Sequence, residues 1–126
     1  MSTTKSLLSI IELGGYPDLN PIYKAHGYKS EVAYSMRKAL VVLKKMKPEV
    51  VVAEFNYQSD FRDRTSSLES LIAVAQRNTN IKIIVFYEKE YHHQFKKLAA
   101  QYEFYAAFAY PIEEELISET LASITG

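Results

Sequence analysis

Five runs of apolar residues alternate along the chain with segments of helical periodicity. The runs are SLLSIIEL (6–13), KSEVAYS (29–35), EVVVAEFNY (49–57), KIIVFYE (82–88) and YAAFAY (105–110). Runs that are mostly continuous, rather than apolar at every second position, are typical of strands covered on both faces. Each run therefore predicts a strand, and together they indicate a parallel sheet covered on both faces.

Between the runs, apolar residues recur at the spacing of one helix face. The four sets are Met36, Ala39, Leu40 and Leu43; Leu68, Leu71, Ile72 and Ala75; Phe95, Leu98, Ala99 and Tyr102; and Ile117, Leu121 and Ile124. A shorter helix, from about Leu19 to His26, is predicted within the glycine- and proline-rich segment 14–27. The alternation predicts an α/β fold, a doubly wound five-stranded parallel sheet with helices on both faces, as a single domain over residues 1–126.

Composition narrows the classes of function. Fifteen Lys and Arg balance fifteen Asp and Glu, so no excess of positive charge favours nucleic acid or an anionic membrane. The absence of cysteine excludes disulfides, thiolate metal ligands and cysteine nucleophiles. No apolar run approaches the roughly 20 residues of a membrane-spanning helix, and the N-terminus lacks the pattern of a signal peptide. We therefore expect a cytoplasmic protein.

Several landmarks recur in a known order. The segment KPEVVVAEFN (47–56) resembles the KPDLVLLD pattern of the third strand in response regulator receiver domains. Gly27-Tyr28 resembles the GY pair before their second strand, and Tyr110-Pro111 resembles the Lys-Pro pair after their fifth. IEEELISETL (112–121) looks like their last helix. The resemblance covers nearly the whole chain. It implies the flavodoxin-like (βα)5 sandwich of receivers and a cis Tyr110-Pro111 bond.

The residues that carry the chemistry of the family are mostly replaced. A receiver takes a phosphoryl group on an aspartate, with Mg²⁺ held by two acids and with a hydroxyl and a lysine on the phosphoryl oxygens. By resemblance, the aspartate position carries Glu54, the acid pair falls on Glu12 and Leu13, the hydroxyl falls on Tyr87 and the lysine on Tyr110. Glu12, Glu54, Tyr87 and Tyr110 would therefore form a degenerate phosphoacceptor pocket. We expect no catalytic residue, no metal and no cofactor.

The switch aromatic of the family aligns with Ala107. Because the hydroxyl position has become bulky while the switch position has become small, we expect Tyr87 to fill the space that the switch ring visits. Two interpretations of Glu54 stay open. Its extra methylene could push its charge outward in imitation of a phosphoaspartate, or it could be a strand-end carboxylate that faces water or pairs with a backbone N–H. A phosphoryl group carries more charge and more acceptor oxygens than a carboxylate, which weighs against imitation.

The resemblance implies a pseudo-receiver of two-component signal transduction, which is not an enzyme and acts by protein–protein interaction. The partners would be proteins of a signalling assembly, not nucleic acid or a membrane. In receivers the fourth helix, fifth strand and last helix form the usual signalling and dimerisation face. Tyr102, Tyr105 and Phe108 lie in or near these elements, so we expect a homodimer or partner contact through them.

A second interpretation is a flavodoxin-like small-molecule-binding or catalytic domain. Folds of this class bind ligands beyond the carboxyl ends of the strands. That rim would collect Glu12, Gly14, Gly15, Glu54, Asn56, Tyr87 and Tyr110. The segment GGYPD (14–18) could cradle a phosphate there, although it fits neither common glycine-rich phosphate pattern. A third interpretation is an active receiver with unusual ligands.

Overall fold

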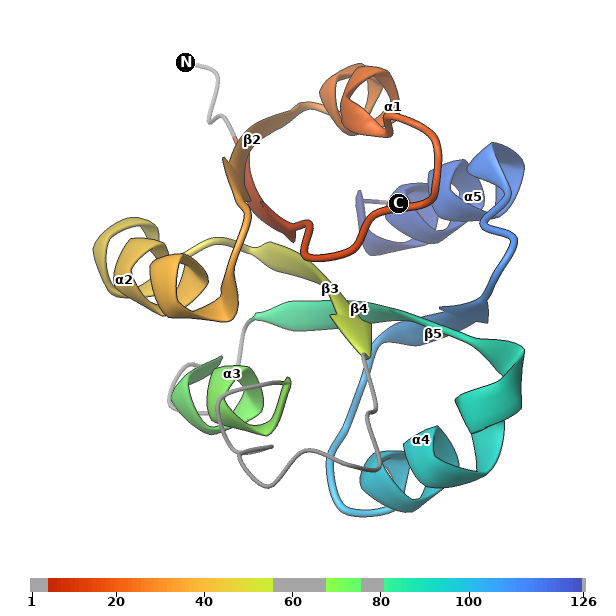
Figure 1. The fold of residues 1–126 in the computed structure, drawn as a ribbon. Helices are drawn as coiled ribbons and strands as arrows, with labels where there is room; N and C mark the ends of the chain where they lie inside the picture. Colours follow the sequence, from red (N-terminus) through yellow and green to blue (C-terminus); the bar gives the residue numbers. More distant parts are fainter. Residues whose placement is uncertain (1–4, 56–67, 76–80, 126) are drawn as a thin grey trace.

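A computed structural model describes residues 5–55, 68–75 and 81–125. One parallel five-stranded sheet runs through it in the order β2-β1-β3-β4-β5 (Figure 1). The strands are β1 (Lys5–Ile10), β2 (Tyr28–Ala33), β3 (Val50–Phe55), β4 (Lys82–Tyr87) and β5 (Ala106–Ala109). The helices are α1 (Asn20–Ala25), α2 (Met36–Met46), α3 (Leu68–Ala75), the short 3₁₀ turn η1 (Lys89–Tyr91), α4 (His92–Ala99) and α5 (Glu114–Thr125).

Helices cover both faces of the sheet. Figure 1 shows α1 and α5 on one side and α2, α3 and α4 on the other. Successive side chains of a strand point to opposite faces, so Val50 and Val52 join the core under α1 and α5, while Val51 and Ala53 join the core under α2 to α4. Glu54 is the next residue in the first series. This alternation directs its side chain towards the α1 and α5 side of the central strand.

The predicted fold class is confirmed, with all five strands and the five helices in the predicted order. The Tyr110-Pro111 bond is cis, as expected. The first strand is shorter than predicted, because it ends at Ile10 rather than at residue 13. The Ile11 N–H still bonds to the carbonyl oxygen of Ala33 on β2 (2.9 Å). The N–H groups of Glu12, Leu13 and Gly14 do not continue this pairing, because they donate to the side chain of Glu54 on β3.

One predicted helix face is also partly wrong. On α4, Phe95 and Leu98 are buried, but Ala99 is exposed because the helix ends there and the chain turns away. Tyr102, expected on the same face, lies beyond the helix and packs against the same core while half-buried. Of the predicted third strand, Asn56 and Tyr57 lie outside the described residues.

Candidate functional site

The site is built around Glu54, which is one residue from the end of the central strand β3 and pairs in register with Phe86 of β4. Only 1% of its surface is exposed. A carboxylate removed from water in this way costs several kcal/mol unless hydrogen-bond donors replace the water. The surroundings of Glu54 therefore have to supply such donors.

Backbone N–H groups of the loop after β1 supply three of them. Leu13 N donates to Oε1 of Glu54 at 2.9 Å, while Glu12 N and Gly14 N donate to Oε2, each at 3.2 Å. Consecutive N–H groups that converge in this way form a concave anion-binding nest. Gly14 has φ +74°, in the left-handed region that favours glycine. The segment from Glu12 to Gly14 thus cradles an anion, but the anion is the protein's own carboxylate.

Tyr16 supplies the fourth donor and covers the site. Its hydroxyl donates to Oε2 of Glu54 at 2.8 Å. Its ring meets Phe86 edge-on at 4.9 Å and stacks on Tyr110 at 6.1 Å between centroids. Burial, and then the charge and hydrogen bond of Glu54, raise the pKa of Tyr16 far above its usual value. The phenol therefore stays protonated and keeps donating.

These four bonds favour the second of the two interpretations of Glu54. Its charge is not pushed outward, as imitation of a phosphoaspartate would require. It turns inward because N–H groups of the loop and the Tyr16 hydroxyl engage both of its oxygens. The structure instead shows a strand-end carboxylate paired with backbone N–H groups. It ties the loop after β1 to the centre of the sheet.

The other predicted pocket residues meet Glu54 in different ways. The exposed Glu12 faces it with its main-chain N–H, and the exposed Leu13 does the same. Tyr110 stacks on the covering ring of Tyr16, and burial followed by the charge of Glu54 raises the pKa of Tyr110. The phenol at the family's lysine position thus remains neutral.

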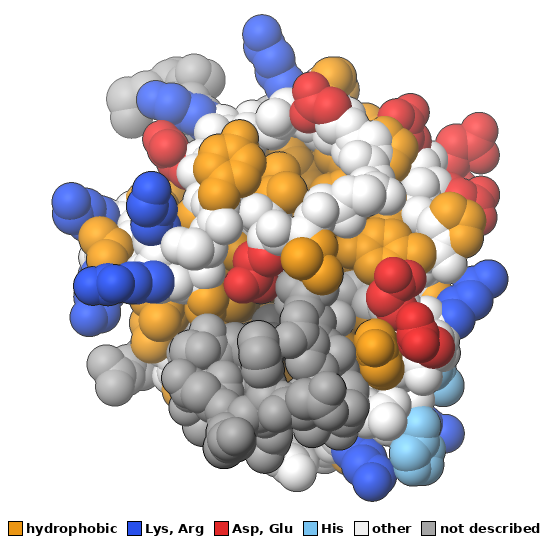
Figure 2. Space-filling model, viewed as in Figure 1, with side chains coloured by type: hydrophobic (Ala, Val, Ile, Leu, Met, Phe, Trp, Pro, Cys, Tyr) orange, Lys and Arg blue, Asp and Glu red, His pale blue; other side chains and the backbone are white. Residues whose placement is uncertain are grey.

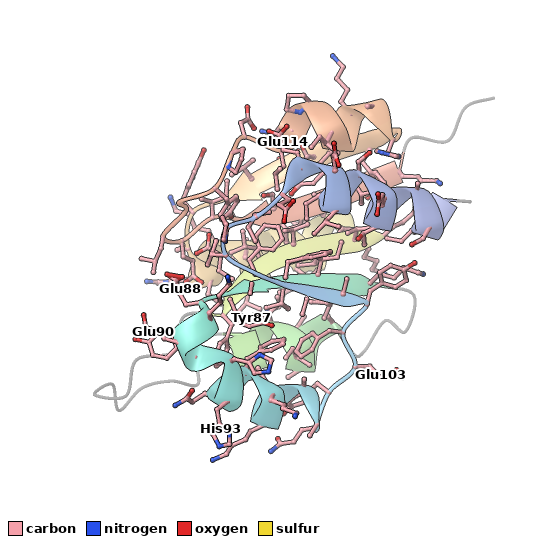
Figure 3. All side chains as sticks on the ribbon, turned by 90° about the vertical axis from the view of Figure 1, so that its right-hand side faces the viewer. Tyr87, Glu88, Glu90, His93, Glu103 and Glu114 are labelled. Carbon is pink, nitrogen blue, oxygen red and sulfur yellow. The ribbon has the colours of Figure 1, made fainter. Side chains whose placement is uncertain are left out.

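Tyr87 is directed elsewhere. Figure 3 shows it where β4 leads into η1 and α4. Its ring stacks on Phe95 at 4.6 Å with an interplanar angle of 10°, and its hydroxyl pairs with Nδ1 of His92 at 3.2 Å. The predicted switch position, Ala107, is exposed on β5. A large aromatic therefore fixes β4 against α4, while Tyr16 covers the carboxylate.

The three proposed interface residues differ in accessibility. Tyr105 is 40% exposed, and its hydroxyl pairs with Oγ of Ser123 on α5 at 2.6 Å. Tyr102 and Phe108 are half-buried, and they pack against the cores on opposite faces of the sheet. Tyr105 is thus the member of the set with the most surface to offer a partner.

Within residues 5–55, 68–75 and 81–125, no group of three or more His, Asp or Glu side chains is arranged to hold a metal ion. Of the acid pair considered for Mg²⁺, the Glu54 oxygens face loop N–H groups, while Glu12 is exposed. Asn56, expected at the same rim, lies outside the described residues.

Tyr16 is the functional residue that the sequence did not reveal. Its signal is an aromatic placed directly after two glycines, at the start of the loop that faces the carboxyl end of β3. Glycines that free backbone N–H groups, followed by a side chain with a hydroxyl, are what a buried acceptor at that edge requires.

Neither models of known protein families nor curated protein sequences match the chain. Several solved structures do match the chain. A response regulator protein from Burkholderia multivorans is 20% identical, with 98% of this chain and 97% of that chain covered and a TM-score of 0.75. This chain has the receiver-domain fold. A receiver domain protein from Clostridium thermocellum is 12% identical over 94% and 92%, with a TM-score of 0.73. The chemotaxis response regulator CheY4 of Vibrio cholerae is 15% identical over 98% and 97%, with a TM-score of 0.67. At these identities the likeness establishes the receiver fold, while the chemistry rests on the residues themselves.

Among the described parts of this receiver fold, no helix is both long and apolar enough to cross a membrane.

Proposed function

We propose that this chain is a signalling module with the receiver fold that takes no phosphoryl group and acts by contact with other proteins. One observation carries the proposal. Glu54, at the phosphoacceptor position, is buried and accepts four hydrogen bonds from the loop that in receivers supplies the metal ligands. That loop therefore binds the carboxylate directly.

Phosphoryl transfer to a carboxylate requires one oxygen to reach phosphorus in line, with cations to neutralise the developing charge. Both oxygens of Glu54 are engaged, and one of them accepts a hydrogen bond from the Tyr16 hydroxyl. No ammonium stands at Tyr110, whose raised pKa keeps the phenol neutral. The hydroxyl of Tyr87 pairs with His92. Among the described residues, no free carboxylate oxygen, cation or free hydroxyl therefore stands where the transfer would require it, which supports the proposal.

The direct test is incubation with acetyl phosphate and Mg²⁺, followed by the intact mass of the protein. We expect no gain of a phosphoryl group, in the wild type or in Glu54→Asp, because the shorter carboxylate restores neither the ammonium nor the metal ligands. A phosphorylatable receiver domain treated alongside shows that the reagents are active. A labile phosphoryl adduct mapped to residue 54 would overturn the proposal.

The face formed by α4, β5 and α5 supports contact with another protein. It offers the exposed ring of Tyr105 between a basic helix and an acidic one, since α4 exposes Lys96 and Lys97 and α5 exposes Glu115 and Glu119. Charges are separated elsewhere too. Figure 2 shows Lys and Arg gathered over α2 and acids towards α5. A two-fold axis at this face would bring opposite charges of two copies together.

We therefore expect a homodimer that Tyr105→Arg weakens, because the substitution places a bulky charge at the centre of this face. Light scattering across a dilution series measures the mass in solution. The matched control is Tyr34→Arg, which changes another exposed tyrosine, 70% accessible, at the carboxyl end of β2. Equal weakening by both variants would contradict this face as the dimer interface. A wild type that is monomeric throughout would contradict the homodimer and leave a different protein as the partner of this face.

A further inference from the structure

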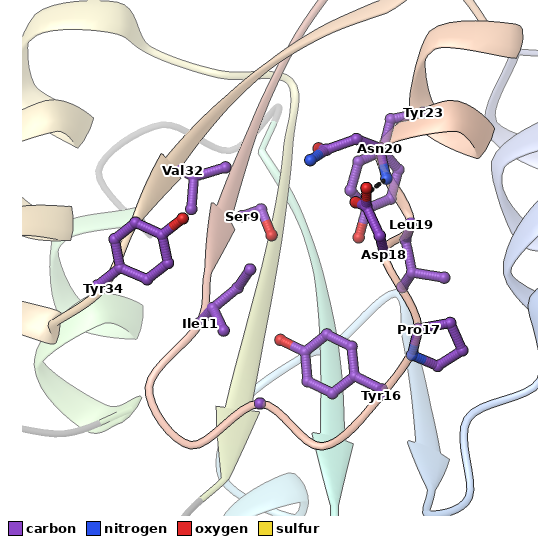
Figure 4. Close-up of a pocket in the computed structure, with 11 residues that line it drawn as sticks. Ser9, Ile11, Tyr16, Pro17, Asp18, Leu19, Asn20, Tyr23, Val32 and Tyr34 are labelled. Carbon is purple, nitrogen blue, oxygen red and sulfur yellow. Dashed lines mark hydrogen bonds between the residues drawn. The ribbon is translucent and has the colours of Figure 1, made fainter.

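A cavity of about 330 Å³ lies beside the Glu54 site, between the carboxyl ends of β1 and β2 and the start of α1 (Figure 4). Its volume is at the lower end of the roughly 300–1,000 Å³ of small-molecule sites. Gly14 and Tyr16, which bind the carboxylate of Glu54, also line this cavity. Whatever fills it therefore touches the same loop.

The hydroxyl of Tyr23 is the polar group in this cavity that the protein leaves unsatisfied. Tyr23 is 2% exposed, and its hydroxyl has no hydrogen-bond partner among the described residues. Burial raises its pKa, and the nearby Ser9 side chain opposes part of that rise. In Figure 4 the hydroxyl ends of Ser9 and Tyr23 point into the space between β1 and α1. A buried hydroxyl without a partner costs about 1–3 kcal/mol, which a bound polar group would recover.

The charge around the cavity favours a cation. Asp18 contributes a carboxylate to the lining, and none of the lining residues is Lys, Arg or His. The buried carboxylate of Glu54 lies directly behind Tyr16. An anion would therefore meet only negative charge, whereas a cation would meet Asp18 and the faces of tyrosine rings, which attract cations.

The walls also suit a short apolar stem. Ile11, Leu19 and Val32 line the cavity together with the tyrosines. A ligand with a positively charged head and a few methylenes would satisfy the oxygens with the head and bury its stem against these side chains.

We propose that this cavity binds a small primary amine, with its ammonium group on the oxygens of Asp18, Ser9 and Tyr23 and its alkyl stem against the apolar walls. The inference deepens the proposed function and rests on it, since it gives a module that takes no phosphoryl group another input. Because Tyr16 and Gly14 face both the amine and Glu54, binding favours the conformation in which the loop is closed on the carboxylate.

The test is titration of the full chain with butylammonium chloride, followed by two-dimensional NMR of the backbone amides. Saturable shifts at Ser9, Gly14 and Tyr16 are expected. 1-Butanol, which has nearly the same shape without the charge, should bind at least about tenfold more weakly, and inorganic phosphate should not bind. Tyr23→Phe should weaken butylammonium about fivefold, the loss of one hydrogen bond of about 1 kcal/mol, and Asp18→Asn should weaken it further.

Tyr28→Phe is the matched control, because Tyr28 is also buried, its hydroxyl also lacks a partner among the described residues, and it does not line the cavity. Equal effects of the two Phe variants, equal binding of butanol, equally strong shifts with MgCl₂, or no saturable shift would overturn the proposal. Tighter binding of Nα-acetyl-lysine methylamide than of butylammonium would replace the free amine with a lysine side chain of a partner. These outcomes do not depend on the acetyl phosphate test, so either proposal can fail alone.

Discussion

Glu54→Gln lowers the free energy of unfolding by about 3 kcal/mol, although it changes one oxygen of the side chain to an NH₂ group. Each oxygen of Glu54 faces at least one donor. In either orientation, an amide sets its NH₂ group against an N–H or O–H group and removes the charge that strengthens the remaining bonds. Hydrogen bonds to a charged group contribute about 1.5–3 kcal/mol, and a buried donor left unpaired costs about 1–3 kcal/mol. Urea denaturation measures the change.

Two variants make this result specific. Glu31→Gln, an identical change at an exposed position of β2, should alter stability by less than about 0.5 kcal/mol. Tyr16→Phe removes one donor and keeps the ring, so it should cost about 1–2 kcal/mol. If Glu54→Gln costs no more than Glu31→Gln, the carboxylate does not hold the loop.

Phe86→Ala has the other large expected effect, a loss of about 3–5 kcal/mol, which is usual for a phenylalanine removed from a core. Phe86 is fully buried beside Glu54 in the sheet, and the rings of Tyr16, Phe108 and Tyr110 lie around it. The cavity left behind removes the support on which the covering ring of Tyr16 rests. The loop after β1 should therefore loosen as well, which amide hydrogen exchange at Gly14, measured relative to core amides of β3, detects.

Phe95→Ala is the control for that local effect. Phe95 is 5% exposed and contacts the rings of Phe55, Tyr87 and Phe104 on the opposite face of the sheet. It should cost similar stability without changing the exchange of Gly14 relative to the β3 core. The same relative change in both variants would mean that Phe86 acts on the loop only through overall stability.

The strands β1, β3 and β4 could be predicted because they are largely buried on both faces, so that every residue from Val50 to Ala53, for example, is apolar. The end of β1 could not. Ile11, Glu12 and Leu13 continue an apolar pattern, and what ends the strand is an acceptor 40 residues further along the chain. A hydrogen bond between residues far apart along the chain leaves no periodic pattern in the local sequence.

The candidate site, too, could be predicted from the sequence only in part. Resemblance pointed to the position of Glu54, and the replaced residues around it predicted the loss of phosphoryl transfer. The direction of the Glu54 carboxylate could not be predicted, because a side chain with an extra methylene can extend towards water or towards a loop. The role of Tyr16 could not be predicted either, since a tyrosine after two glycines also fits an ordinary turn. The direction of the Tyr87 side chain towards α4 could not be predicted for a similar reason, because it depends on stacking with Phe95, a residue of another element.

In the proposed function, the loop after β1 is bound to Glu54, and this binding prevents the carboxylate from taking a phosphoryl group. Hydrogen exchange of the amides of Glu12, Leu13 and Gly14, with and without acetyl phosphate and Mg²⁺, tests it most directly. We expect slow exchange of all three amides, unchanged by the reagents and accelerated in Glu54→Gln more than in Tyr16→Phe. Exchange as fast as in an unstructured peptide, or exchange that accelerates when acetyl phosphate and Mg²⁺ are added, would contradict it.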